Sequence, residues 1–365
     1  MTHDGFSPSP APTLAVYLAG VGDVGSALLD QLAAVGDPRL RLVGACTTRG
    51  HAWEPRGLEP AAARTAVQAG GEPDWPRTTA ALAALGPPVV FVDATGSPAV
   101  ADLYGRLLAA GVHVATPSKL ANTRRQADFE ALLAAAATGG AHYRYEATVG
   151  AGLPVIRVVQ DLVATGDRLR AAEGVLSGTM TYLFSRVEAG VPFSEAVCEA
   201  VAAGYAEPDP RDDLSGEDVV RKGLILARTA GLVLEREDVA AENLVPEALR
   251  GVGREAFLAA LPALDAAWAA RAVAARREGR VLRYVVRLEQ SRLRVGTEAV
   301  PAGSALGQLG GTDNLLRLTT DRYARSPLTV QGPGAGPAVT AAGVFADVLD
   351  IATRVVAPAS ARLAA

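Results

Sequence analysis

The feature that most constrains this chain is a glycine-rich turn between an apolar segment and a helical pattern near the N-terminus. Residues 13–19 form an apolar run typical of a buried strand, and residues 24–36 have the spacing of a helix. Between them stand Gly20, Gly22 and Gly25, in the pattern G-x-G-x-x-G. Glycines so placed let backbone N–H groups approach a pyrophosphate at a helix N-terminus. The turn predicts a nucleotide site, and the alternative is a tight glycine turn without a ligand.

Strand and helix patterns alternate through the first part of the chain. Further apolar strand patterns lie at residues 41–48, 87–96, 112–117 and 142–150, mostly with helical patterns between them. This alternation predicts an α/β fold with a Rossmann-type doubly wound parallel sheet. After residue 150 the patterns change to helices followed by alternating strands, which predicts an α+β domain.

These patterns divide the chain into four parts. We expect a disordered lead-in at 1–12, a nucleotide-binding domain at 13–150, a second domain at 151–325, and a C-terminal segment at 326–365. We also expect the C-terminal segment to return to the nucleotide-binding domain, although periodicity alone does not show this.

The composition narrows the class of protein. The 365 residues are 49% hydrophobic and 20% charged with a net charge of -4, which argues against a broad nucleic-acid surface. No apolar stretch is long enough to predict a helix that spans a membrane, so we expect no membrane partner. The N-terminus lacks the pattern of a signal peptide. Cys46 and Cys198 are too few for a disulfide framework. We therefore expect a cytoplasmic protein that acts on a small molecule.

Lysine is rare in this chain. Of 35 lysine and arginine residues, only Lys119 and Lys222 are lysines. Lysine can give up its proton near neutral pH when it is buried, whereas arginine cannot. The two lysines are therefore candidates for proton transfer, although an arginine-biased composition could also leave two lysines by chance.

The end of the second predicted strand bears on the choice of cofactor. NAD-binding domains place an acidic residue about 20 residues after the glycines to hold the ribose hydroxyl. Residues 45–49 contain no acid and end in Arg49, which could meet a 2′-phosphate. This favours NADP(H), with NAD(H) as the alternative and a solvated surface arginine as the other interpretation of Arg49.

An acidic, proline-stiffened loop leads to the second lysine. It begins at residue 204, contains Glu207, and continues into a helix that carries Asp218 and Lys222 on one face. Such a loop suits a substrate with an amino group and a carbonyl. The alternative is an ordinary helix start, with Ser215 as the N-cap and Asp218–Lys222 as a routine ion pair. The acid spacing does not match a calcium-binding EF-hand.

At this point the chain resembles a known family. The segment GYAEPDPRDDLSGEDVVRK, together with EATVGAGLPVI, LSGTMTYLF, GTDN and GPGAGPAVTA in that order, is similar to homoserine dehydrogenases over roughly residues 13–352. The resemblance implies a homodimeric, two-domain enzyme that interconverts L-aspartate 4-semialdehyde and L-homoserine with NADP(H). It implies that residues 151–325 are a substrate-binding and dimerisation domain, and it implies a place in threonine and methionine biosynthesis.

The resemblance also implies roles for particular residues. Lys222 matches the proton donor and acceptor, and Lys119 matches the other active-site lysine. The substrate-binding positions match Glu207, Asp218, Gly178 and Thr179. A monovalent cation, Na⁺ or K⁺, matches Glu146, Val149, Ala151 and Leu153. The cofactor positions match Gly20, Gly22, Asp23, Val24, Gly25, Arg49, Thr95, Gly96, Ser97, Lys119 and Gly332.

Two departures and two alternatives accompany this interpretation. The chain reads SGTMTY at residues 177–182 where many bacterial relatives read NGTTNY, and its length leaves no room for their regulatory ACT domain. We therefore expect no ACT-mediated inhibition by threonine.

One alternative is a dehydrogenase that acts on the same aldehyde from the acid side, which would need a cysteine nucleophile. The sequence around Cys46 and around Cys198 suggests this role for neither residue. The other alternative is a catalytically silent NADP-binding sensor.

Overall fold

The computed structural model describes residues 13–86 and 88–356, so the expected lead-in at residues 1–12 lies outside the described residues. The chain forms two compact units. Unit 1 comprises the described residues up to Ser118, Glu130–Tyr145 and the described residues from Val344 onward, and unit 2 comprises Lys119–Phe129 and Glu146–Gly343. The chain passes from unit 1 to unit 2 directly before Lys119, returns to unit 1 at Glu130, and passes to unit 2 again between Tyr145 and Glu146.

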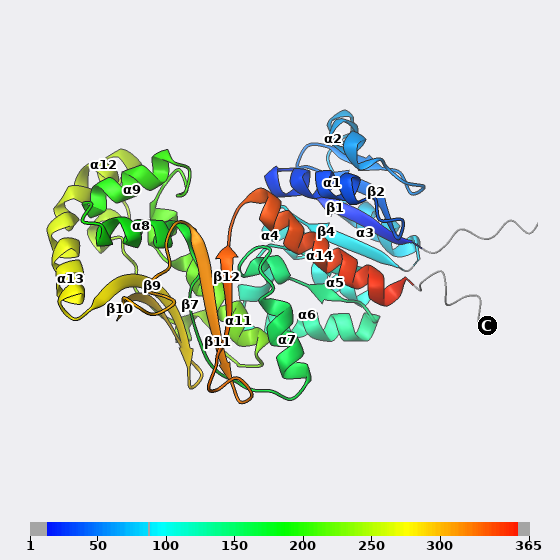
Figure 1. Ribbon diagram of the computed structural model, residues 1–365. Helices are drawn as coiled ribbons and strands as arrows, with labels where there is room; N and C mark the ends of the chain where they lie inside the picture. The colour runs from blue at the N-terminus through cyan, green and yellow to red at the C-terminus, as the bar shows by residue number, and fades with distance from the viewer. Residues whose placement is uncertain (1–12, 87, 357–365) are drawn as a thin grey trace, which may run out of the picture. The chain divides into compact units, whose positions relative to one another are not determined.

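Unit 1 is built on a sheet in the order β3-β2-β1-β4-β5-β6. Figure 1 labels its strands β1, β2 and β4. All neighbours are parallel except β2 and β3, which pair antiparallel at the edge. Its central strands are buried throughout, as strands covered on both faces must be. The strands are β1 (Leu14–Ala19), β2 (Leu40–Cys46), β3 (His51–Trp53), β4 (Val89–Asp93), β5 (His113–Ala115) and β6 (Tyr143–Arg144).

The helices of unit 1 connect these strands. The stretch 50–77 contains strand β3, helix α2 and the start of α3. The last expected strand, residues 142–150, pairs over only two residues before a 3-10 turn at Glu146–Thr148. The helices are α1 (Asp23–Val35), α2 (Pro60–Ala69), α3 (Trp75–Ala84), α4 (Pro98–Ala101), α5 (Tyr104–Ala109), and the parts of α6 (Gln126–Gly139) and α14 (Pro337–Val355) within this unit.

Unit 2 contains the second sheet, in the order β12-β11-β7-β9-β10-β8. Its neighbours are antiparallel except β8 and β10, as the alternating patterns after residue 150 predicted for an α+β domain. The strands are β7 (Leu169–Val175), β8 (Ala240–Ala241), β9 (Arg280–Glu289), β10 (Arg292–Pro301), β11 (Asp313–Thr320) and β12 (Leu328–Pro333).

Three long helices of unit 2, α8, α11 and α13, pack on strands of this sheet, and α7 and α9 pack on other helices. Glycine at position 223 lets α11 lie close to β9 and β10, because a Cβ there would come within 2.8 Å of Val286 and 3.1 Å of Leu293. The helices are α7 (Ile156–Ala164), α8 (Gly178–Glu188), α9 (Phe193–Ala202), α10 (Arg211–Leu214), α11 (Glu217–Thr229), α12 (Arg254–Ala260) and α13 (Asp265–Arg277).

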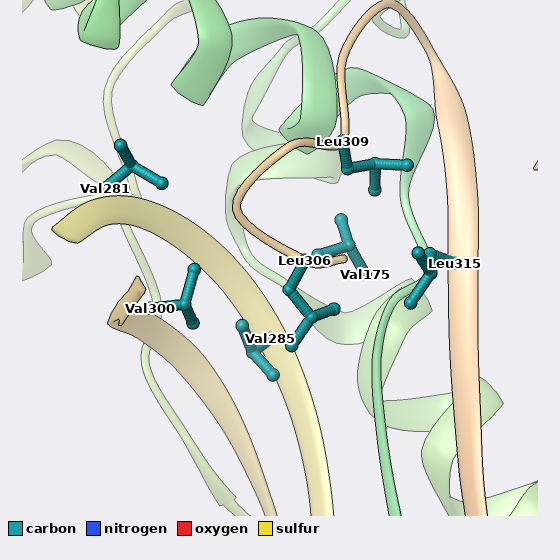
Figure 2. Close-up of a cluster of buried hydrophobic side chains, with 7 residues drawn as sticks. All are labelled: Val175, Val281, Val285, Val300, Leu306, Leu309 and Leu315. Atoms are coloured by element: carbon teal, nitrogen blue, oxygen red, sulfur yellow. The ribbon is translucent and has the colours of Figure 1, made fainter. Parts of the chain in front are cut away.

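A buried apolar cluster closes one end of the sheet of unit 2. Figure 2 shows side chains from β7, β9, β10 and β11 meeting two leucines of the loop before β11. The guanidinium of Arg283 lies under the same loop and donates to the carbonyl oxygens of Leu306, Gly307 and Leu309. The cluster consists of Val175, Val281, Val285, Val300, Leu306, Leu309 and Leu315.

The segment Arg254–Arg277 is long and apolar enough, by length and composition alone, to cross a membrane. In the structure it is interrupted by a 3-10 turn at Leu261–Leu264, and the Trp268 ring stacks on Phe193 at 5.0 Å. These are the contacts of a helix that packs within unit 2. The expected lack of a membrane partner stays a prediction.

Candidate active site

Helix α11 carries two of the expected site residues on one face. It begins after Gly216, whose φ of 73° and close approach to Tyr284 leave no room for a side chain. Ser215, the N-cap in the alternative interpretation of this segment, is not the N-cap residue, but its hydroxyl accepts the Glu217 N–H at 3.2 Å. Asp218 and Lys222 then follow one helical turn apart.

The Lys222 ammonium has two fixed acceptors. It donates to the carbonyl oxygen of Leu176 at 2.7 Å and lies 2.8 Å from Oδ2 of Asp218. The side chain is only 10% exposed. Within the described chain these two oxygens are its acceptors, so the third ammonium hydrogen remains for a substrate oxygen.

Lys119 meets the same carboxylate from a different part of the chain. Its Nζ lies 3.2 Å from Oδ1 of Asp218, so each lysine takes one oxygen of a single aspartate. The turn after Lys119 is fixed locally, because its carbonyl oxygen accepts from the Thr123 N–H and hydroxyl. The two lysines, which stand about a hundred residues apart in the sequence, therefore share one counter-ion within unit 2.

The charges of this cluster shift its proton affinities. Burial lowers the pKa of Lys119, the ammonium of Lys222 and the guanidinium of Arg221 lower it further, and Asp218 opposes them. The pKa of Asp218 is held well below its usual range, because both lysine ammonium groups outweigh the opposing effect of burial. The site thus contains a carboxylate that stays ionised and a lysine that releases its proton more readily than usual.

The acidic loop is organised by a residue that the sequence analysis did not single out. One oxygen of Asp213 accepts the Glu207 N–H at 2.8 Å, and the other lies 3.0 Å from the Thr179 hydroxyl. That hydroxyl is also 2.6 Å from the carbonyl oxygen of Tyr205. Burial raises the pKa of Asp213. Asp213 belongs to the acidic loop of the sequence, but only its contacts in the structure distinguish it from the neighbouring acidic residues.

These residues line one cavity of about 1200 Å³ within unit 2. Gly178, Thr179, Glu207, Asp218 and Lys222, all expected at the substrate site, lie on its wall. Acidic and basic groups therefore face a space large enough for a small amino acid. The geometry suits a ligand with an ammonium group at one end and a polarised oxygen near Lys222.

The glycine-rich turn of unit 1 has the geometry expected for a pyrophosphate site. A Cβ on Gly25 would come 1.8 Å from the carbonyl oxygen of Gly20, so only glycine permits this approach. Gly22, the N-cap of α1, faces open space and offers no side-chain cap. The N–H groups of the first turn, from Asp23 and Val24 onward, remain available to an anion.

A second segment at the same edge of the sheet follows β4. Asp93 is buried and accepts the N–H and hydroxyl of Thr95 at 2.7 and 2.6 Å, and it also accepts the Tyr104 hydroxyl. Burial raises the pKa of Asp93, although these hydrogen bonds oppose the shift. The Thr95 hydroxyl in turn accepts the Ser97 N–H at 3.0 Å, which fixes Gly96 between them.

Of the other expected cofactor residues, Arg49 follows β2, a parallel neighbour of β1, and Gly332 lies in unit 2. Arg49 is exposed on the loop between β2 and β3 of unit 1. Gly332 belongs to β12 of unit 2, opposite Asn314. A Cβ on the nearby Gly334 would come 1.9 Å from the Asn314 amide nitrogen, which explains the glycine-rich run there. The Asn314 side chain is buried and has no hydrogen-bond partner among the described residues.

The expected cation site contains a carboxylate that is already engaged. Glu146 accepts the N–H groups of Val155, Ile156 and Arg157 at 2.6–2.9 Å, at the start of α7. The described residues contain no group of three or more histidine, cysteine or acidic side chains that could hold a metal. Ala151 nevertheless has a φ of 53°, unusual for a residue with a side chain.

Together, a nucleotide-type parallel sheet and a lysine-carboxylate cavity define the class of the NAD(P)-dependent oxidoreductases. Residues 20–146 match the NAD binding domain of homoserine dehydrogenase, and residues 154–349 match the homoserine dehydrogenase family itself. The chain belongs to the homoserine dehydrogenase family.

Individual relatives agree with this membership. The chain is 39% identical to a homoserine dehydrogenase of Emericella nidulans, over 93% of this chain and 99% of that protein. It is 40% identical to a chloroplastic bifunctional aspartokinase/homoserine dehydrogenase of Daucus carota, over 95% of this chain. The chain spans only 39% of the length of that bifunctional relative.

Solved structures share the fold. A protein of unknown function from Candida auris has a TM-score of 0.90 at 35% identity, covering 94% of this chain and 99% of that one. A hyperthermophilic archaeal homoserine dehydrogenase, solved in complex with NADPH, has a TM-score of 0.73 at 20% identity, covering 94% of this chain and 98% of that one.

Substitutions at two of the glycines separate folding from binding. We expect Gly25→Ala to lower the melting temperature, because its Cβ would overlap the Gly20 carbonyl. Gly22→Ala should fold normally, since its Cβ faces open space, but should weaken binding of NADP(H) by crowding the pyrophosphate. Thermal unfolding and cofactor titration by fluorescence measure the two effects. Equal melting temperatures and equal affinities for both variants would contradict the assignment.

Removal of the shared carboxylate should change the titration of Lys119. In Asp218→Asn the negative charge that raises the pKa of Lys119 is lost, so this pKa should fall further and the free amine should appear at lower pH. Competitive labelling with acetic anhydride across pH, read by peptide mass spectrometry, follows each lysine separately. Asp212→Asn, on the same cavity wall, is the control. A labelling curve for Lys119 identical to wild type would refute the shared-carboxylate account.

Proposed function

We propose that the protein is an NADP(H)-dependent homoserine dehydrogenase that interconverts L-aspartate 4-semialdehyde and L-homoserine. The observation that carries the proposal is the single carboxylate of Asp218 shared by Lys119 and Lys222 on the wall of the acidic cavity. Family membership and the NADPH complex of the archaeal relative support the reaction and the cofactor.

The residues of the cavity suit the reduction of an amino aldehyde. Bound NADPH supplies the hydride, and negative charge then develops on the aldehyde oxygen. The third hydrogen of the Lys222 ammonium is the proton for that oxygen, and its positive charge stabilises the developing alkoxide. In the reverse direction Lys222 accepts the proton from the hydroxyl of homoserine.

The other groups orient the substrate and adjust the lysines. Glu207 lines the cavity, and its carboxylate is suited to hold the substrate ammonium. Gly178 and Thr179, at the start of α8, line the same cavity, and the Thr179 hydroxyl contacts Asp213, which accepts the Glu207 N–H. Asp218 stays ionised, so it keeps both ammonium groups in place while Lys119 lies close enough to affect proton transfer.

Unit 1 is the proposed cofactor domain, and Arg49 favours NADP(H) over NAD(H). At the cation site, the carboxylate of Glu146 is occupied by α7, so a Na⁺ or K⁺ ion would take the main-chain oxygens of Val149, Ala151 and Leu153. The positive φ of Ala151 supports such a turn. A homodimer, a cytoplasmic location and a place in threonine and methionine biosynthesis complete the proposal.

Initial rates of homoserine oxidation at alkaline pH, with NADP and NAD in parallel, test the function. Turnover with homoserine but not with threonine or malate is the expected result, with a higher kcat/KM for NADP. A folded protein that binds NADP without turnover would instead support the catalytically silent sensor. A preference for NAD would contradict the role of Arg49.

Replacement of Lys222 tests its part in the chemistry. We expect Lys222→Ala to lower kcat by ~10²–10⁴-fold, the usual cost of losing a positioned acid or base. Lys222→Arg should fail as well, because arginine keeps the charge but not an exchangeable proton. Steady-state rates on both variants, with Arg277→Ala as a remote control, measure the effect. A Lys222→Ala enzyme with more than a tenth of wild-type kcat would remove Lys222 from this role.

A further inference from the structure

A buried arginine lies at the far end of the helix that carries the catalytic lysine. Arg228 is on the last turn of α11, and its side chain is fully buried. Its Nη1 donates to the carbonyl oxygens of Asn122 and Arg124 at 2.8 and 2.7 Å. These two carbonyls belong to the turn that directly follows Lys119.

The same guanidinium also binds a third segment. Its Nε and Nη2 donate to the carbonyl oxygen of Leu234 at 3.2 and 2.8 Å, and Nη2 lies 3.2 Å from Glu235. Glu235 in turn accepts the Gln126 N–H with both oxygens at 3.0 Å, at the start of α6. The planar guanidinium of Arg228, together with Glu235, therefore holds the segment at residues 122–126 against the end of α11. A lysine at position 228 could not reach all of these acceptors, because its donors converge on one atom.

The segment at residues 119–126 is thus attached to α11 at two places. Lys119 pairs with Asp218 at the first turn, and residues 122 and 124 bind Arg228 at the last turn, about 15 Å further along the helix by its rise. The Lys119 pair alone is a single contact between partly exposed groups, with side chains 25% and 50% exposed, and such pairs hold little by themselves.

We propose that Arg228 is a positioning residue for the reaction: it fixes the turn at residues 122–124 to α11 and thereby keeps the Lys119 ammonium on the carboxylate of Asp218. The inference rests on the proposed function for its effect on catalysis, but the position of Lys119 can be measured without turnover. The charged groups that act on Lys119 are Asp218, Lys222 and Arg221, all on α11.

Arg228→Gln tests the proposal, and Arg283→Gln is a matched control. Arg283 is also a buried arginine of unit 2 that binds three loop carbonyls and one glutamate, Glu188, but its contacts include neither lysine. Both variants should lose stability. Only Arg228→Gln should release Lys119 from its surroundings, so that the pKa of Lys119 rises toward its ordinary value.

The readout is competitive labelling of the full-length protein with acetic anhydride across pH, followed by peptide mass spectrometry. We expect the Lys119 curve to move to higher pH in Arg228→Gln and to stay unchanged in Arg283→Gln. If the glutamine variant does not fold, Arg228→Lys with Arg283→Lys as control gives the same comparison, because peptides separate the new lysine from Lys119. An unchanged Lys119 curve in a folded Arg228 variant would overturn the proposal.

Rates of homoserine oxidation complete the test. The Arg228 variant should lose at least about ten-fold in kcat with a smaller change in KM, and Arg283→Gln should keep the kcat of wild type. A shifted Lys119 curve in a chain whose wild type never oxidises homoserine would reject the proposed function and retain the positioning role. Normal homoserine oxidation by the wild type, with an unshifted Lys119 curve in the Arg228 variant, would support the proposed function and reject the positioning role.

Discussion

One carboxylate between two ammonium groups is the interaction on which this site depends. Asp218 offers one oxygen to Lys119 and the other to Lys222, and its pKa is low because both cations favour the ionised form. Without that charge, two ammonium groups would repel each other beside the cavity. With it, Lys222 keeps two fixed acceptors and a third hydrogen directed to a ligand, and Lys119 is held where its proton is released more easily.

The buried arginines and the two lysines of this structure have different kinds of partner. Arginines such as Arg228 and Arg283 are buried and bind several carbonyl oxygens at once, which suits a planar group that never loses its proton. The two lysines share the carboxylate of Asp218, and Lys222 lines the cavity, where a changeable charge is useful. In the proposed reaction, these buried arginines join segments of the chain and the two lysines stand where a proton is exchanged.

Much of this arrangement could be predicted from local patterns. The glycine turn before α1, the parallel sheet and the Asp218–Lys222 pair each depend on residues close together in the sequence, and the structure contains all three. The meeting of Lys119 with Asp218 could not be predicted from periodicity, since it depends on Arg228 drawing a distant turn onto α11. The function of Asp213 and the replacement of Ser215 by Gly216 as the helix cap likewise come from packing against other segments.

The central claim is that the Lys222 amine itself exchanges the proton with the substrate oxygen, and chemical rescue tests it most directly. Lys222→Ala leaves space beside Asp218 that a small amine can enter. Homoserine oxidation by this variant should rise in proportion to added ethylamine in its free-base form, while Lys222→Arg, whose side chain fills the space, should not respond. A Lys222→Ala protein that binds NADP and homoserine yet shows no dependence on the amine would contradict the account.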